Sequence, residues 1–228
     1  MWIESLTSWW TANQRLTFLL LEALWDTIVM VGVSGFVGFL FGIPFGVLLH
    51  LTKKNGLMEN KHFNRYFGAI INAGRSIPFI ILLVAIIPFT RLLVGSSIGT
   101  SAAIVPLAVA AIPFIARMVE GALLEVPSGL VEAAIAMGAT TRQIVWKVLL
   151  PEALPGILNV ATITLVTLVG YSAMAGTVGG GGLGDVGIRY GYQRFDGTVM
   201  AITVVILIVL VQLIQSIGDH FVKRFDYR

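Results

Sequence analysis

Residues 27–52 read TIVMVGVSGFVGFLFGIPFGVLLHLT and contain no charged side chain. A helix needs about 20 mainly apolar residues to cross the hydrocarbon core of a bilayer. This stretch is long enough, so it predicts a membrane-spanning helix. Residues 94–116, 154–176 and 197–219 are also apolar, with at most one charged residue each. They predict three further spans.

The composition of the whole chain agrees with a membrane protein. Of 228 residues, 57% are hydrophobic and 12% are charged, whereas about a quarter of the residues of a soluble domain are charged. A soluble fold of this size cannot hide so much apolar surface from water. The absence of cysteine excludes disulfide scaffolds, thiolate metal sites and cysteine nucleophiles. The net charge of +3 does not indicate nucleic-acid binding, because Lys and Arg also gather in the cytoplasmic loops of membrane proteins.

A fifth span is predicted over residues 67–90, although Arg75 interrupts it. An arginine at the middle of a spanning helix costs about 2.5–3.5 kcal/mol, but near one end it can extend to the interface or face a wet cavity. The predicted fold is therefore all-α: a polytopic bundle of five transmembrane helices. Residues 1–228 form one transmembrane domain, since no long linker or repeat divides the chain.

The basic residues of the loops predict the orientation of these spans. One side of the membrane receives Lys53, Lys54, Lys61, Arg65, Arg117, Arg142, Lys147, Lys223, Arg224 and Arg228. The other side receives Arg15, Arg91, Arg189 and Arg194. The side richer in Lys and Arg is expected to be cytoplasmic. This places the N-terminus outside and the C-terminus in the cytoplasm, with residues 4–26 as an outer interfacial helix before the first span.

The loop between the third and fourth spans is too long for a plain connector. Residues 125–155 read EVPSGLVEAAIAMGATTRQIVWKVLLPEALP. Ser128 is expected to cap a first short helix, and Gly138 to end it in a left-handed conformation. Thr140 and Gln143 have the spacing of a capping box that begins a second helix. Residues 128–150 thus form a helical elbow, which either packs under its own bundle or docks another protein.

This loop resembles the EAA motif of the permease subunits of ABC importers. The matching residues are Glu132, Ala133, Ala134 and Gly138, followed by Val148, Leu150 and Pro151. The family usually has isoleucine in place of Val148, which is a conservative difference. The resemblance extends over nearly the whole chain to the methionine-importing permeases, carried by residues 72–91 and 179–195. It implies a multi-pass permease of the bacterial inner membrane, and as substrate methionine, including both stereoisomers.

The resemblance also implies the partners. Two permease copies form a homodimer around one path, two cytoplasmic ATPase subunits dock beneath it, and an extracytoplasmic binding protein delivers the substrate. ATP and Mg²⁺ are bound by the ATPase, and this chain binds no cofactor and no metal and is not an enzyme. The elbow contains the coupling helices that ATP-driven closure displaces. Six residues are implied in coupling: Glu132, Ala133, Ala134, Gly138, Arg142 and Lys147.

The fourth span is the best candidate for the translocation path. Thr164, Thr167, Tyr171 and Met174 recur near helical spacing and form a polar and polarizable stripe. The threonines could instead bond to their own backbone or to neighbouring helices. Arg75 is a further candidate, either facing the inner vestibule or extending to the interface.

Gly179, Gly181 and Gly184 satisfy G-x-G-x-x-G. A dinucleotide site requires a preceding strand within a βαβ unit, whereas these residues follow a membrane span. They are interpreted as a flexible loop at the outer gate. Three alternatives remain for the chain: a permease for another amino acid or small polar solute, an ATP-independent channel or facilitator, and a membrane enzyme, for which no clustered ionisable residues are evident.

Overall fold

The structure, a computed structural model, describes the backbone of residues 2–225 and the side chains of residues 14–225. Every regular element in these residues is helical, which confirms the all-α prediction. The elements are α1 (Trp2–Thr52), α2 (Lys61–Ser76), α3 (Phe79–Ala85), α4 (Ile87–Val94), α5 (Thr100–Leu124), α6 (Ser128–Ala136), α7 (Thr141–Ile144), the π-helix η1 (Val145–Leu149), α8 (Leu150–Glu152), α9 (Leu154–Gly176), α10 (Gly182–Val186), the π-helix η2 (Gly187–Tyr192) and α11 (Gly197–Phe225).

Four helices, α1, α5, α9 and α11, are each long and apolar enough to cross a membrane. The fifth predicted span is a broken one, because α2 and α3 meet at an angle of 99°. The break falls at Pro78, which lacks a backbone N–H and pushes the preceding Ile77 into an extended conformation (φ −80°, ψ 123°). Residues 67–90 are therefore not one straight helix. They include the end of α2, all of α3 and the start of α4, and these three helices form a bent segment.

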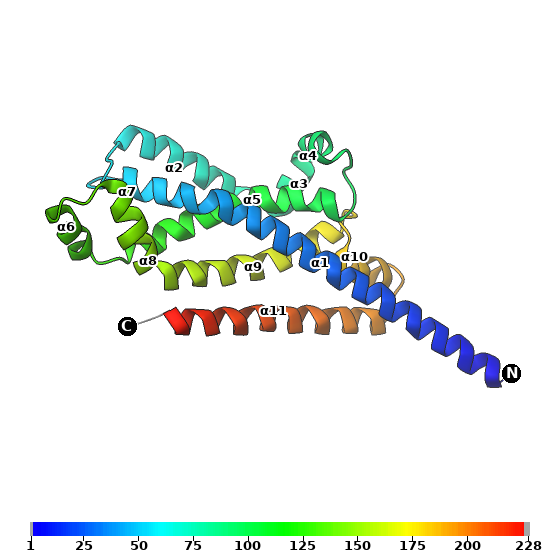
Figure 1. Cartoon of the computed structure of the whole chain (residues 1–228). Coiled ribbons are helices and arrows are strands. Elements are labelled where there is room, and N and C mark those ends of the chain that lie inside the picture. Colours follow the sequence, from blue (N-terminus) through cyan, green and yellow to red (C-terminus); the bar gives the residue numbers. More distant parts are fainter. Residues whose placement is uncertain (1, 226–228) are drawn as a thin grey trace.

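The first helix is longer than its predicted span. It runs unbroken over 51 residues from Trp2 to Thr52, about 76 Å at 1.5 Å per residue. Residues 4–26 are thus not a separate interfacial helix, and the N-terminal part of α1 projects beyond the rest of the bundle (Figure 1).

Helix α5 lies at the centre of the bundle, and three glycines of α1 determine how closely the two helices pack. Gly38, Gly42 and Gly46 are spaced four residues apart on one face of α1. A Cβ atom at Gly42 would lie 2.7 Å from the side chain of Ile115, so only glycine permits this approach. Small residues at such spacing allow helix backbones to come together in membranes.

The third predicted span is displaced along the sequence, since α5 covers residues 100–124 rather than 94–116. Gly95 and Gly99 have φ of +79° and +97°, which ends α4 and delays the start of α5. At its other end the helix continues past Arg117, whose guanidinium donates to the Glu120 carboxylate and to Asn72 Oδ1 at 2.9 Å. The positive charge of Arg117 is thereby paired within the protein, so α5 can continue past this residue.

Figure 1 shows α6, α7 and α8 at one end of the bundle, with the last turn of α11 on the same side. The short helices α4 and α10 lie toward the other end. The main core cluster connects both ends, because it contains buried residues of α1, α5 and α9 together with Ala134, Ile144 and Leu149 of the elbow. The elbow is therefore packed onto the bundle through its own hydrophobic residues.

Candidate functional site

The first helix of the elbow, α6, begins differently from the sequence prediction. The N-cap position is occupied by Pro127, no side chain caps the helix, and Ser128 is its first residue. The expectation that Ser128 is the cap is therefore wrong. Pro127 has φ of −59° and ψ of 128°, the non-helical conformation typical of an N-cap, so the first turn begins at Ser128, one residue earlier than expected.

The end of α6 is a complete Schellman motif. The N–H of Gly138 donates to the carbonyl of Ile135 at 2.9 Å, and the N–H of Ala139 donates to the carbonyl of Ala134 at 3.0 Å. Gly138 has φ of +77°, which confirms the predicted left-handed stop. A Cβ at Gly138 would meet no atom within 4 Å. Glycine is required here by the backbone conformation and not by close packing.

The second part of the elbow begins with the predicted capping box. Thr140 Oγ1 accepts from the N–H of Gln143 at 3.4 Å, and Gln143 Oε1 accepts from the N–H of Thr140 at 2.8 Å. After α7 the backbone widens into the π-helix η1 before α8 returns to the membrane. Ile144 and Leu149 are each 1% exposed, so this part anchors the elbow to the bundle.

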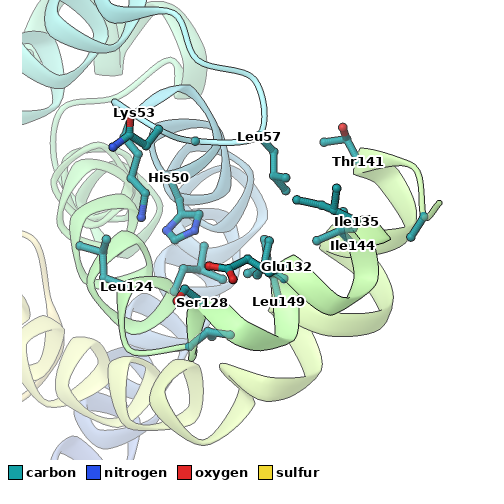
Figure 2. Close-up of a pocket in the computed structure, with 16 residues that line it drawn as sticks. His50, Lys53, Leu57, Leu124, Ser128, Glu132, Ile135, Thr141, Ile144 and Leu149 are labelled. Carbon is teal, nitrogen blue, oxygen red and sulfur yellow. The ribbon is translucent and has the colours of Figure 1, made fainter. Parts of the chain in front are cut away.

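The three residues of the EAA motif lie in three different environments. Ala134 is buried against the bundle, whereas Ala133 is exposed on the outer side of α6. Glu132 lines a cavity of about 640 Å³ between the elbow and the C-terminal end of α1. In Figure 2, His50 extends into this cavity from α1, and Lys53 extends into it from the turn after α1. The Glu132 carboxylate is turned toward these two side chains.

The sequence did not indicate that residues of α1 would face the elbow. The His50 Nδ1 atom is buried, and it has no hydrogen-bond partner among the described residues. Burial lowers the pKa of the Lys53 ammonium from its usual range, although the nearby Glu120 carboxylate opposes this effect. The cavity thus has cationic and anionic groups on opposite walls, in addition to aliphatic side chains.

The outer surface of the elbow is exposed and partly apolar. Met137 is 81% exposed and Leu130 is 43% exposed. The implied coupling residues Arg142 and Lys147 are also exposed, and no ion pair to either is found within residues 14–225. This surface is available to a partner.

The residues of the predicted stripe on α9 do not all lie on one face of the helix. Thr164 is 1% exposed and points into the core. Its hydroxyl donates to the Val160 carbonyl at 2.7 Å, and that of Thr167 donates to the Ile163 carbonyl at 2.8 Å. Both threonines therefore satisfy their hydroxyls on their own helix, as the alternative reading of these residues allowed.

The open face of α9 passes through Ile163, Gly170 and Met174, with Thr167 half-buried between them. The sequence did not indicate Ile163 and Gly170, because neither has the polar or polarizable side chain that marked the predicted stripe. Ile163 and Gly170 nevertheless precede Met174 by eleven and four residues, which is helical spacing. Tyr171 lies beside this face and stacks on Phe79 of α3.

Arg75 is exposed near the end of α2, and its guanidinium lies 5.9 Å from the ring centroid of Phe114. Such a contact can hold an arginine against an aromatic face. It fixes the position of the side chain near α5 without burying the charge.

The three glycines of the predicted outer loop are closely packed: Gly179 and Gly181 lie in the turn between α9 and α10, and Gly184 lies in α10. Gly179 and Gly181 have φ of +83° and +80°. The Gly179 carbonyl accepts from the N–H of Gly99 at 2.8 Å. A Cβ at Gly184 would lie 2.5 Å from the Ala173 Cα. These contacts join α10 to α9, and the turn before α10 to the start of α5.

The family described as "Binding-protein-dependent transport system inner membrane component" matches residues 42–227. The "Probable D-methionine transport system permease protein MetI" of Vibrio cholerae is 64% identical over 228 residues, which is all of both chains. The "D-methionine transport system permease protein MetI" of Escherichia coli (strain K12) is 62% identical over 164 residues, covering 72% of this chain and 76% of the relative.

Solved structures of transporters share the fold. A chain from inward-facing conformations of the MetNI methionine ABC transporter has a TM-score of 0.91 at 59% identity, covering 92% of this chain and 98% of the other. A chain of an amino acid ABC transporter crystallised with histidines has a TM-score of 0.77 at 18% identity, covering 94% of this chain and 97% of the other. The second similarity concerns the fold alone.

Proposed function

The chain belongs to the family of binding-protein-dependent transport system inner membrane components, and from this premise we propose that it forms the methionine path of an ATP-driven importer. The membership covers residues 42–227. The substrate is supported by the probable D-methionine transport system permease of Vibrio cholerae, which is 64% identical along its full length. Transport of both stereoisomers is part of the proposal.

One observation supports the coupling role most directly: the elbow exposes apolar side chains outside the membrane spans. Met137 is 81% exposed and Leu130 is 43% exposed on α6. Exposed apolar surface of this kind is typical of an interaction site. A separate ATPase is the proposed partner, since the similar structure is that of an ABC transporter, MetNI. The exposed residues Arg142 and Lys147 are suited to meeting acidic groups on that partner.

The proposed mechanism uses the way in which the elbow is built. Its outer face, with Ala133 and Met137, contacts the ATPase, while Ala134, Ile144 and Leu149 bind it to the core of the bundle. Movement of the ATPase is therefore passed to α1, α5 and α9 as a rigid displacement. ATP shifts the bundle only if the two conformations differ in their contacts with the ATPase. ATP and Mg²⁺ are bound and used by that partner.

In the proposed assembly, two copies of this chain surround one path, two ATPase subunits bind the elbows, and an extracytoplasmic protein delivers methionine. The open face of α9, with Ile163, Gly170 and Met174, is proposed to line the path. The turn containing Gly179, Gly181 and Gly184 is proposed to close its outer end. The elbow and the end of α11 face the cytoplasm, and the N-terminus lies outside.

An ATP-independent facilitator is the main alternative, but it gives no reason for an exposed apolar elbow. The substrate is tested by uptake of labelled methionine into membrane vesicles from cells with and without this chain. Uptake is expected to require the chain, and to be reduced by unlabelled L- and D-methionine more than by other amino acids. Equal competition by unrelated amino acids would contradict the substrate assignment and leave the permease assignment intact.

A further inference from the structure

A groove of about 310 Å³ lies between α9 and α11, in the half of the bundle nearest the elbow. Its walls include Leu158 and Leu165 of α9 and Ile214, Ile217 and Phe221 of α11. Ile217 is 56% exposed and Phe221 is 46% exposed. The groove is thus an open apolar channel along the membrane-spanning surface.

The groove offers no polar group to an occupant. The one hydroxyl in its lining belongs to Thr162, which donates to the carbonyl of Leu158 at 3.1 Å. Thr162 also touches α11, because a Cβ at Gly218 would overlap its side chain. The two helices therefore lie in direct contact at Gly218 and Thr162, which form the floor of the groove. An occupant must be apolar and narrow.

Another side of the same helix pair is polar. There, Glu125, Glu152 and Asn159 line a separate cavity of about 200 Å³ together with Val222 of α11. Asn159 follows Leu158 directly, so it is rotated by about 100° away from the groove. The polar side is suited to water, whereas the groove is suited to hydrocarbon.

A positive charge lies one turn beyond the groove. Arg224 follows Phe221 by three residues and Ile217 by seven, so the three residues share one face of α11. Its side chain is exposed in the last turn of the helix, beyond the apolar part of α11. Lys223 is the adjacent residue, and the helix rotates it by about 100° from Arg224.

We propose that this groove binds an anionic phospholipid, with one acyl chain between α9 and α11 and its phosphate at Arg224. The apolar lining of the groove favours an acyl chain, and the Arg224 guanidinium favours a negatively charged headgroup. Basic residues at the ends of grooves between membrane helices are suited to anionic lipids. The lipid fixes the spacing of α9 and α11 where the elbow joins the membrane, whichever solute the transporter carries.

The test is native mass spectrometry of the purified assembly with its ATPase. Phosphatidylglycerol and phosphatidylcholine with the same acyl chains are added separately, and their affinities are compared. The wild-type assembly is expected to prefer phosphatidylglycerol by about fivefold. Arg224→Ala should remove most of this preference, whereas the matched control Lys223→Ala should retain it. Ala161→Leu, which narrows the groove, should weaken the binding of both lipids.

Equal affinity for the two lipids in the wild type would overturn the proposal, as would equal effects of Arg224→Ala and Lys223→Ala. The chain contains no cysteine, so Ile217→Cys can also be tested alone. Disulfide formation between two copies at this position would show that a second copy fills the groove, and the lipid proposal would then be wrong.

Discussion

The ring of Tyr171 lies flat against the ring of Phe79, with 4.5 Å between their centroids and 4° between their planes. This stack joins α9 to α3, the short helix that follows the break at Pro78. Phe79 is 5% exposed, so the contact is part of the core. It holds the broken second span beside the helix that is proposed to line the path.

Loss of this stack is expected to loosen the junction between α3 and α9. Tyr171→Ala removes an aromatic pair worth about 0.5–1.5 kcal/mol beyond the burial of its area, and leaves a cavity as well. The thermal unfolding midpoint in detergent should fall clearly. Tyr171→Phe keeps the ring and should change the midpoint little. A comparable fall of the unfolding midpoint in both variants would mean that the Tyr171 hydroxyl, and not the ring stack, holds the two helices together.

Gly138 is expected to be required for coupling because of its backbone conformation. Its φ of +77° costs a residue with a side chain about 1–2 kcal/mol. Gly138→Ala should therefore disturb the end of α6 and lower the number of methionine molecules transported per ATP hydrolysed. Gly121→Ala is the control, since a Cβ there also meets no atom within 4 Å but its helix is regular. Unchanged coupling in Gly138→Ala would contradict the role of the elbow.

The local features of the elbow could be predicted from the sequence, whereas its surroundings could not. Thr140 and Gln143 form their capping box within one turn, so four residues suffice to specify it. Ser128 failed as a cap because the preceding Pro127 already had the conformation of an N-cap. The approach of Lys53 to the side of α6 depends on the packing of α1, which is distant in the sequence.

For the membrane spans too, local features could be predicted from the sequence and the packing around them could not. Apolar composition was enough to predict α9 over residues 154–176, where the helix begins and ends at the predicted residues. It could not give the 99° angle between α2 and α3, because a proline marks a break without fixing its direction. Nor could it separate buried Thr164 from exposed Met174, since both lie in an apolar helix and only the neighbours determine which face is open.

Gly184 is expected to be essential for the packing of α10 on α9. A Cβ at this position would lie 2.5 Å from the Ala173 Cα, and a backbone atom cannot move aside as a side chain can. Gly184→Ala should destabilise the protein by about 1–3 kcal/mol, measured as a lower unfolding midpoint. In the control Gly32→Ala the new methyl group meets nothing within 4 Å, so stability should be retained. An unaffected midpoint in Gly184→Ala would show that α10 is packed differently.

Single cysteines can test which face of α9 lines the path, because the chain has none of its own. Met174→Cys lies on the open face, where the native residue is 47% exposed, whereas Thr164→Cys replaces a residue that is 1% exposed. A small water-soluble thiol reagent should label Met174→Cys and leave Thr164→Cys unreacted. If only a lipid-soluble reagent labelled Met174→Cys, this face would be directed at the bilayer.

ATP hydrolysis by a partner is proposed to drive methionine through this chain. It is tested most directly in proteoliposomes that contain the permease and its ATPase, with the binding protein outside and nucleotide inside. Labelled methionine should accumulate against its gradient with ATP and Mg²⁺, and not with a non-hydrolysable analogue. Equal methionine flux with the analogue, or with the permease alone, would contradict the account and indicate a facilitator.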